Sequence, residues 1–194
     1  MDQSGELVKK LKQGDQSVFT AVVNEYQDMV YNTAIGIVQN AEDADDITQE
    51  VFVQVHLSVQ SFKGESKFST WLYRITISKA LDHEKKKKRK KRFAFIQGLI
   101  GNQQEEDLHP VEFNHQGIQL EKKESAKDLF KALKKIPDNQ RIAFTLHKLE
   151  GQSYQEISEI MALSLNAVES LMGRAKTNLK KALDAWYQQK LFDQ

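Results

Sequence analysis

Apolar residues recur at intervals of three and four along most of this chain, a spacing that gathers them on one side of a helix. In the first half, the pattern predicts helices over residues 18–38 and 44–59, and a third helix from Phe68 into a run of lysines. Asn40 separates the first helix from the second, and a short segment with Gly64 separates the second from the third. These helices form a first unit.

The periodicity fails over residues 93–118, which contain several glycines and a proline. We interpret residues 93–119 as a linker, although Phe93 and its apolar neighbours leave open a short helix or docking on a partner. Helical spacing then returns, and Pro137 stands where a new helix can begin, since its missing amide hydrogen would be unpaired there. The prediction is an all-α chain of two small helical domains, residues 1–92 and 120–194, joined by that linker.

The second domain ends in a pair of helices. Ser153 and Glu156 have the capping-box spacing, which predicts a short helix over residues 154–161. A three-residue turn follows, and Ser164 is placed to cap a last helix that continues past Leu179. Two helices across such a turn indicate a helix-turn-helix. Taken alone, this hairpin fits a packing motif as well as a DNA reader.

The residue content argues against catalysis. Cysteine is absent, so disulfides and thiolate metal sites are excluded. The five histidines have no metal-ligand spacing and no paired nucleophile nearby, and no glycine-rich phosphate loop is present. We therefore expect no metal, no cofactor, no small-molecule substrate and no enzymatic activity.

Charge and hydropathy bear on location and partners. No stretch approaches the roughly 18 uninterrupted apolar residues of a membrane span, and no signal peptide is visible, so we expect a cytoplasmic protein without membrane insertion. The net charge of +1 conceals acidic residues gathered at 42–50 and eight consecutive cations at 85–92. Nucleic acid is the cytoplasmic polyanion that suits this basic run, while a solvated helix end is the alternative.

Several segments carry a family resemblance. Those in the second domain are residues 136–144 (IPDNQRIAF), 151–157 (GQSYQEI), 164–168 and 174–176, and those in the first are residues 43–52 (DADDITQEVF), 62–75 and the basic run. They resemble, respectively, region four and region two of the extracytoplasmic-function (ECF) sigma factors. The connection lacks room for the extra domain of larger sigma factors. The resemblance therefore implies a two-domain factor that directs core RNA polymerase to promoters and opens them.

The resemblance implies that the acidic helix binds the basic clamp coiled coil of the largest polymerase subunit. Attraction between opposite charges would speed docking, and buried apolar neighbours would supply most of the lasting affinity. An acidic first turn that merely suits its own helix dipole is the alternative interpretation. The implied core-binding residues are Asp43, Asp46, Ile47, Gln49, Glu50 and Phe52.

The loop after this helix and the next helix resemble the part that opens the promoter element called −10. Extruding a base costs a few kcal/mol, which stacking on aromatic groups can offset at about 1 to 3 kcal/mol per base. For Phe68 and Trp71, a place in the hydrophobic core is the competing interpretation. The implied −10 residues are Phe62, Lys63, Phe68, Trp71, Arg74, Ser78, Lys79, Asp82, Lys85 and Lys86.

The last helix would read the −35 element in the major groove. Asn can contact adenine and Glu can accept from cytosine, so arginine is not required at every position. Many family members carry Asn where Ser78 stands and cations where Glu169 and Leu171 stand. The promoter sequence that this chain recognises is therefore left undetermined. Since cations are missing from the last helix, the basic run should supply more of the salt-dependent attraction to DNA. The implied −35 residues are Arg141, Ser153, Tyr154, Ser164, Asn166, Ala167, Glu169, Ser170, Arg174 and Lys176.

The expected partners are core RNA polymerase and promoter DNA, and the family analogy adds an anti-sigma factor. Two other functions remain open from the residues. A conventional regulator would bind duplex DNA specifically without polymerase. A helical adaptor with an incidental basic run would not bind DNA at all.

Overall fold

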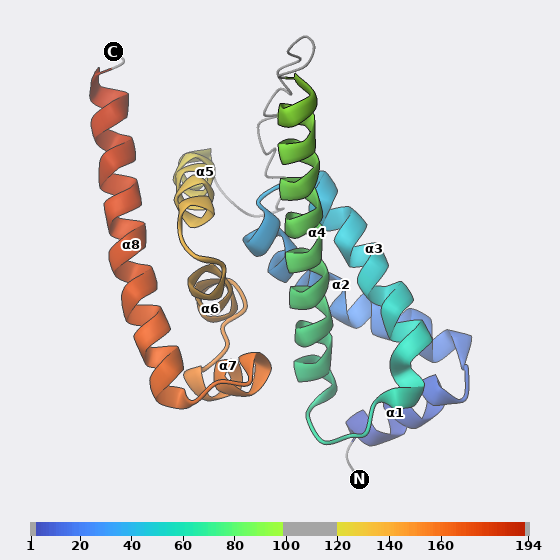
Figure 1. Cartoon of the computed structure of the whole chain (residues 1–194). Helices are drawn as coiled ribbons and strands as arrows, with labels where there is room; N and C mark the ends of the chain where they lie inside the picture. Colours follow the sequence, from blue (N-terminus) through green and yellow to red (C-terminus); the bar gives the residue numbers. More distant parts are fainter. Residues whose placement is uncertain (1–2, 99–119, 193–194) are drawn as a thin grey trace.

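All regular elements in the described residues, 3–98 and 120–192 of a computed structural model, are helical, which confirms the all-α prediction (Figure 1). The N-terminal domain contains α1 (Gln3–Lys12), α2 (Gln16–Val38), α3 (Ala41–Ser58), a 3-10 turn (Val59–Ser61) and α4 (Phe68–Gly98). The C-terminal domain contains α5 (Leu120–Lys135), α6 (Asp138–Lys148), α7 (Tyr154–Met161) and α8 (Leu165–Phe192).

Helices α2, α3 and α4 pack around one apolar core. Their predicted stripes face inward, and fully buried side chains include Val30, Ile37, Ile47, Val51 and Leu72. Burying a side chain of this size stabilises the fold by about 1.5 to 3 kcal/mol relative to leaving it in water. The core therefore rests on the three-and-four spacing visible in the sequence.

The connection between α2 and α3 is a short, well-capped break at the predicted position. Gln39 ends α2 in the left-handed conformation and donates its amide hydrogen to the Ile35 carbonyl. Asn40 then caps α3, because its side chain accepts from the Asp43 amide at 2.8 Å. Both ends of the break thus have partners for otherwise unpaired backbone groups.

Helix α1 was not predicted from the sequence. It packs Val8 and Leu11 onto the N-terminal core, and Lys12 Nζ donates to the Phe62 carbonyl oxygen at 2.7 Å. Helix α1 thereby supports the segment that leads into α4.

Helix α4 extends beyond the predicted end of the first unit, since it continues past Arg92 to Gly98. The first residues of the predicted linker are therefore helical. The rest of that linker, residues 99–119, lies outside the described residues.

The helix-turn-helix is present as predicted. Ser153 and Glu156 form both halves of the capping box at the start of α7, and Ala162 ends that helix in the left-handed conformation. Ser164 Oγ then accepts from the Ala167 amide at 3.3 Å, which caps α8. A separate cluster that includes Leu133 and Leu179 holds α5 against α8.

The two domains are packed together, a point that the sequence had left open. Helix α6 lies against α2 and α7 lies against α4 (Figure 1). The main hydrophobic cluster runs across the boundary and includes Ile142, Leu146 and Ile157 beside the N-terminal core.

Candidate polymerase and nucleic-acid interfaces

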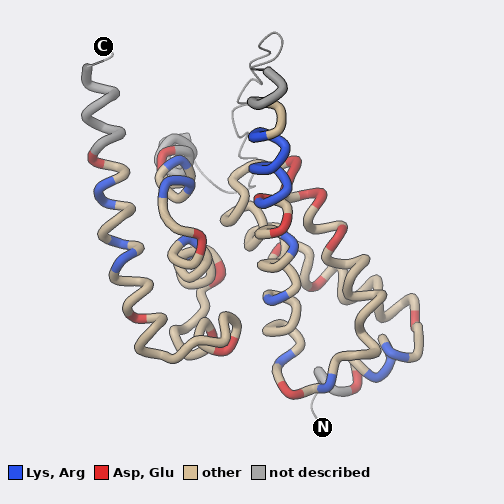
Figure 2. Tube along the Cα trace, in the orientation of Figure 1, with Lys and Arg blue, Asp and Glu red and all other residues tan. Residues whose placement is uncertain are grey.

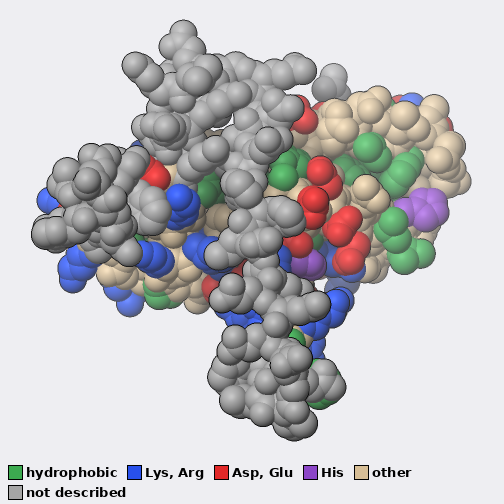
Figure 3. Space-filling model, turned by 90° about the horizontal axis from the view of Figure 1, so that it is seen from above, with side chains coloured by type: hydrophobic (Ala, Val, Ile, Leu, Met, Phe, Trp, Pro, Cys, Tyr) green, Lys and Arg blue, Asp and Glu red, His purple; other side chains and the backbone are tan. Residues whose placement is uncertain are grey.

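The outer face of α3 presents the acidic residues that the sequence singled out. Asp46, Gln49 and Glu50 are exposed, whereas Ile47 and Phe52 are buried beneath them. Figure 3 shows acidic side chains gathered on one face of the molecule, next to hydrophobic ones. A partner of opposite charge can reach this face directly.

Asp43 is placed differently from its neighbours. Its side chain is only 17% exposed and turns toward α4, where Oδ2 accepts from Lys87 Nζ at 2.6 Å and Oδ1 lies 3.6 Å from His83 Nε2. Glu50 Oε2 and Lys79 Nζ form a second ion pair between the two helices, at 3.5 Å. The acidic helix and the basic helix are thus tied to each other.

An apolar groove continues this face and was missed in the sequence. It lies between α2 and α3, and Phe19, Phe52 and His56 help to line it. At its rim, Val53 is 59% exposed and Leu57 is 70% exposed. These two residues fall outside the buried stripe of their helix, which is the signal that could have identified them.

The aromatic residues proposed for the −10 element form one cluster. The ring centroids of Phe62 and Phe68 lie 5.9 Å apart, and those of Phe62 and Trp71 lie 5.1 Å apart. Phe62 and Phe68 are buried, whereas Trp71 is half-buried at the edge of the cluster. Only Trp71 in this cluster offers part of a ring to a partner.

The polar −10 candidates lie along α4 and before it. Lys63, Arg74, Ser78, Asp82, Lys85 and Lys86 are exposed and Lys79 is half-buried. Figure 2 shows cations succeeding one another along α4, beside the acidic residues of α3. Cations spaced three and four residues apart on a helix repel one another, so this stretch favours a polyanionic partner.

The recognition-helix candidates form an open polar face near the start of α8. Ser164, Asn166, Glu169, Ser170, Arg174 and Lys176 are exposed, and Ala167 is half-buried. Arg174 Nε donates to the Ser170 carbonyl oxygen at 3.2 Å, which keeps its guanidinium along the helix. At the start of α7, Ser153 is exposed and Tyr154 is half-buried.

Arg141 is not on that open face. It is 2% exposed, and Nη2 donates to Asp138 Oδ1 at 2.6 Å in the first turn of α6. Its Nε has no hydrogen-bond partner among the described residues. In this conformation Arg141 belongs to the interior of the C-terminal domain.

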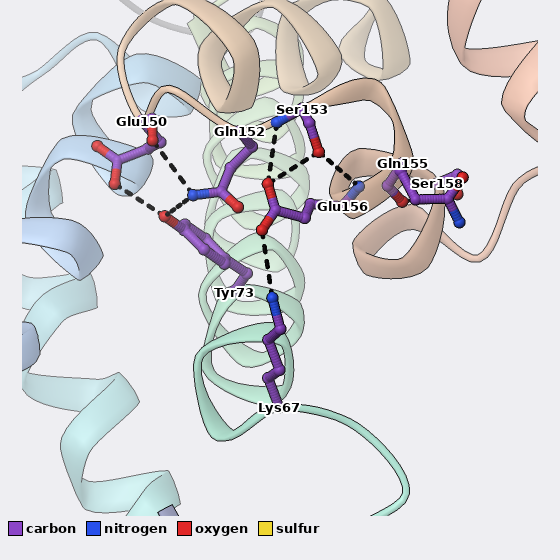
Figure 4. Close-up of polar contacts among 8 residues, drawn as sticks. All are labelled: Lys67, Tyr73, Glu150, Gln152, Ser153, Gln155, Glu156 and Ser158. Carbon is purple, nitrogen blue, oxygen red and sulfur yellow. Dashed lines mark hydrogen bonds and ion pairs between the residues drawn. The ribbon is translucent and has the colours of Figure 1, made fainter.

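A polar cluster that the sequence did not predict lies between the domains (Figure 4). Tyr73 Oη of α4 donates to Glu150 Oε2 at 3.0 Å and accepts from Gln152 Nε2 at 3.1 Å. Lys67 Nζ lies 3.4 Å from Glu156 Oε1. We call these five residues the interdomain cluster.

Burial and hydrogen bonding shift the acidities in the interdomain cluster. Burial raises the pKa of the Glu150 carboxyl, which the hydrogen bond from Tyr73 only partly offsets. Burial, together with the Glu150 charge, raises the pKa of the Tyr73 hydroxyl. The amide and hydroxyl of Ser153 lower the pKa of Glu156, and Lys67 adds to this effect.

Comparison with known proteins decides the family. The protein family described as Sigma-70 region 2 matches residues 22–90, and that described as Sigma-70, region 4 matches residues 126–179. The RNA polymerase sigma-H factor of Pseudomonas aeruginosa is 30% identical over 189 residues, which cover 94% of each chain. The chain belongs to the ECF sigma factors.

Other relatives agree. The ECF RNA polymerase sigma-E factor of Haemophilus influenzae is 29% identical over 177 residues, covering 91% of this chain and 93% of the relative. That of Escherichia coli K12 is 29% identical over 170 residues, covering 88% of each chain. This sigma factor therefore binds core RNA polymerase and promoter DNA and directs promoter-specific initiation, as the resemblance implied.

Two solved structures share the fold. CnrH, in complex with the cytosolic domain of CnrY, is similar with a TM-score of 0.68 and 23% identity, over 95% of this chain and 99% of that one. The sigma factor RpoE in complex with the anti-sigma factor NepR from Bartonella quintana is similar with a TM-score of 0.58 and 23% identity, over 86% of this chain and 96% of that one.

The described residues contain neither a membrane span nor a metal-binding group. None of the helices there is long and apolar enough to cross a membrane. No group of acidic and histidine side chains in the same residues could hold a metal ion.

Proposed function

We propose that this sigma factor binds core polymerase through the exposed face of α3 and the apolar groove beside it. Asp46, Gln49 and Glu50 supply the charged and polar contacts, and Val53 and Leu57 supply the apolar ones. Ile47 and Phe52 support the face from inside. The observation that carries this proposal is the pair of large apolar side chains left exposed directly beside the acidic residues.

The polar edge of α4 takes the −10 element. Trp71 offers a ring edge for stacking, and Lys63, Arg74 and Lys79 lie where they can hold phosphates of the displaced strand. Phe62 and Phe68 shape this surface as core residues. Lys85 and Lys86 begin the basic run that continues the surface along α4.

The start of α8 reads the −35 element, with Asn166, Glu169 and Ser170 toward base edges and Arg174 and Lys176 toward phosphates. Ser153 and Tyr154 at the start of α7 approach the phosphate backbone of the DNA. Ser164, which caps α8 by accepting from the Ala167 amide, fixes the position at which that helix begins. Arg141 supports this unit from its interior. The two domains proposed from the sequence, 1–92 and 120–194, keep these roles, with the first extended to Gly98 at the end of α4.

The regulatory setting follows from the same surfaces. An anti-sigma factor that covers the polymerase-binding face would hold the protein inactive. We propose that this sigma factor acts in the cytoplasm, where core polymerase is found, and that it has no catalytic activity of its own.

Co-purification with core polymerase, followed by run-off transcription, tests the proposal. Leu57→Asp places a charge in the apolar face and should reduce core binding at least tenfold without changing the helical content. Ala21→Asp adds the same charge at an exposed position of α2 that does not line the groove, and should bind core normally. Equal core binding by the two variants would exclude the groove from the interface.

A further inference from the structure

Helix α1 is tied to the segment that leaves α3 by two hydrogen bonds that run in opposite directions. Lys12 Nζ donates to the Phe62 carbonyl oxygen at 2.7 Å, and Gln60 Nε2 donates to the Lys12 carbonyl oxygen at 2.5 Å. Figure 1 shows α1 beside this segment, where the chain turns toward α4. One residue of α1 therefore holds two points of the connection between α3 and α4.

The position of Lys12 is set by the packing of its own helix. Val8 and Leu11 are buried and belong to the N-terminal core, and Lys12 follows them as the half-buried last residue of α1. A cation is favoured at this end of a helix, and the last carbonyls of a helix need partners from outside it. The Gln60 side chain supplies such a partner. Lys12 is thus a fixed point to which a neighbouring segment can be attached.

The segment that Lys12 contacts begins the α3–α4 loop, residues 62–67. The buried rings of Phe62 and Phe68 anchor the two ends of this loop in the aromatic cluster. Between them, the backbone of residues 63–66 makes no hydrogen bond within the described part of the chain. Gly64 adds a φ of 77°, which glycine adopts readily. The shape of the loop therefore depends on how its ends are held.

Lys12 fixes the first peptide group of the α3–α4 loop. The Phe62 carbonyl belongs to the peptide bond that leads into Lys63, and in a planar trans peptide the C=O and the N–H point in opposite directions. Because the carbonyl is held toward α1, the Lys63 amide hydrogen is directed away from α1. Burial of the Phe62 ring does not fix this plane by itself, since the plane can rotate about the Cα–C bond of Phe62.

We propose that Lys12 is a positioning residue for promoter opening, which holds the α3–α4 loop in the conformation that accepts the −10 element. Two contacts proposed for that element lie beside the held peptide: Lys63 is exposed in the loop, and the Trp71 ring centroid lies 5.1 Å from that of Phe62. The role of Lys12 rests on the proposed function of this surface.

This role is separate from polymerase binding. The groove proposed for core polymerase is lined from Gln16 onward, beyond the end of α1. The −35 contacts are proposed on α7 and α8, in the other domain. Loss of the Lys12 ammonium should therefore change −10 binding alone.

The size of the effect depends on how often a released loop adopts the accepting conformation. If it does so one tenth of the time without Lys12 Nζ, the apparent affinity for the opened −10 strand falls about tenfold. We expect a loss of about this size, with core binding within twofold of wild type.

Lys12→Met tests the proposal in the holoenzyme, because it keeps an apolar side chain and removes the ammonium. The DNA is a promoter that the wild-type holoenzyme selects from a random library, used as a single strand with its −10 sequence intact or scrambled. Lys12→Met should bind the intact strand about tenfold more weakly and the scrambled strand as wild type does. Wild-type affinity of the variant for the intact strand would overturn the proposal.

Two variants of the same helix are the controls. Lys9→Met removes an equal charge from an exposed position of α1 and should leave both affinities unchanged. Lys12→Arg keeps a donor for the Phe62 carbonyl and should recover most of the affinity for the intact strand. If Lys9→Met loses as much as Lys12→Met, or if Lys12→Met weakens both strands alike, Lys12 acts by its charge on DNA and not through the loop.

Gln60→Leu tests the second hydrogen bond from the other side. Gln60 is exposed, so little packing is lost, and affinity for the intact strand should fall less than in Lys12→Met because Lys12 Nζ remains. Thermal unfolding and core titration accompany both variants. Losses of −10 affinity that follow a lower melting temperature and weaker core binding would show that α1 only stabilises the domain, against the proposal.

Trp71→Leu distinguishes failure of this proposal from failure of the proposed function, since it removes the stacking ring and keeps an apolar side chain. If Trp71→Leu binds the intact strand normally, the proposed −10 surface is wrong. If Trp71→Leu is impaired while Lys12→Met is normal, the surface stands and the role of Lys12 is wrong.

Discussion

Asp43 Oδ2 accepts a hydrogen bond from Lys87 Nζ at 2.6 Å, so the first turn of the acidic helix is joined to the start of the basic run. The carboxylate also faces His83. Asp43 thus stabilises the contact between α3 and α4, whereas Asp46 beside it points to solvent.

These different placements predict different phenotypes for two charge reversals. Asp46→Lys should weaken core binding at least tenfold and leave the melting temperature nearly unchanged. Asp43→Lys removes the acceptor of Lys87 and sets a second cation against it, and should destabilise the N-terminal domain by about 1 to 3 kcal/mol. Thermal unfolding followed by core titration distinguishes them, and equal melting temperatures would contradict the structural role of Asp43.

The capping box predicts an acid-sensitive α7. Ser153→Ala should lower the stability of the C-terminal domain by about 1 kcal/mol. Because the pKa of Glu156 is lowered in the folded protein, its contribution is present above the ordinary value of 4.5 and is lost as the pH falls through the lowered one. Denaturant unfolding of wild type and Glu156→Gln should converge in acid, and a constant difference at all pH values would exclude this effect.

Arg141 offers a test between a structural and a DNA-binding role. Arg141→Met keeps the length and apolar stem but removes the buried charge, and Asp138, which is 45% exposed, stays solvated, so the loss is smaller than for breaking a fully buried pair. We expect stability within about 1 kcal/mol of wild type and little change in −35 binding by the holoenzyme. A selective loss of −35 affinity with normal stability would show instead that Arg141 turns outward on DNA.

The basic run predicts the salt dependence of promoter binding. Each phosphate contact contributes about −0.9 to the slope of log affinity against log salt. Replacing Lys88, Arg89 and Lys90, all exposed, with Gln should reduce the magnitude of that slope by as much as about 2.7 if each cation meets a phosphate. The same replacement at Lys180 and Lys181 is the control, and equal slopes for all variants would remove the run from the interface.

Glu150 predicts that the stability of the folded chain depends on pH. Burial raises the pKa of Glu150 in the folded protein, and unfolding would return it toward 4.5, so protonation favours the folded state. The added stability is full below that value and is lost as pH rises through the raised pKa. The free energy of unfolding should fall over this range relative to that of Glu150→Gln.

Glu150→Gln is the comparison for that titration, since Lys67, Tyr73 and Glu156 remain in place and Glu156 acts with the opposite sign. The variant should keep its free energy of unfolding as pH rises through the range in which wild type loses stability. Parallel titrations of the two proteins would assign the pH effect to another group.

Much of the fold could be predicted because its determinants are local. The spacing of Val22 and Val30 or of Ile47 and Val51 specifies a buried helical stripe, and Ser153 with Glu156 specifies a helix start. Helix α1 was missed because it is short and precedes the clear periodicity. The contact between α6 and α2, in which Thr145 Oγ1 donates to the Gly36 carbonyl oxygen at 3.2 Å, could not be inferred, since these residues are far apart in sequence and neither belongs to a pattern.

The candidate site was only partly predictable for a related reason. The family resemblance implied that Asp43, Asp46, Gln49 and Glu50 face outward; the last three are exposed, but the expectation was wrong for Asp43, which is 17% exposed. Sequence position could not reveal that Asp43 turns to Lys87, because that contact depends on how α4 crosses α3. Val53 and Leu57 were overlooked because apolar residues on a helix are most often assigned to its core.

The pairing of the acidic α3 with the cationic α4 also affects how strongly the free protein is attracted to DNA. Opposite charges within a Debye length of about 8 Å partly cancel each other's field, so the unassembled factor is poorly attracted to bulk chromosomal DNA. Under the proposed function, docking of a basic partner on α3 would neutralise the acidic side and leave the cations of α4 uncompensated. Affinity for DNA would then rise on assembly with the polymerase.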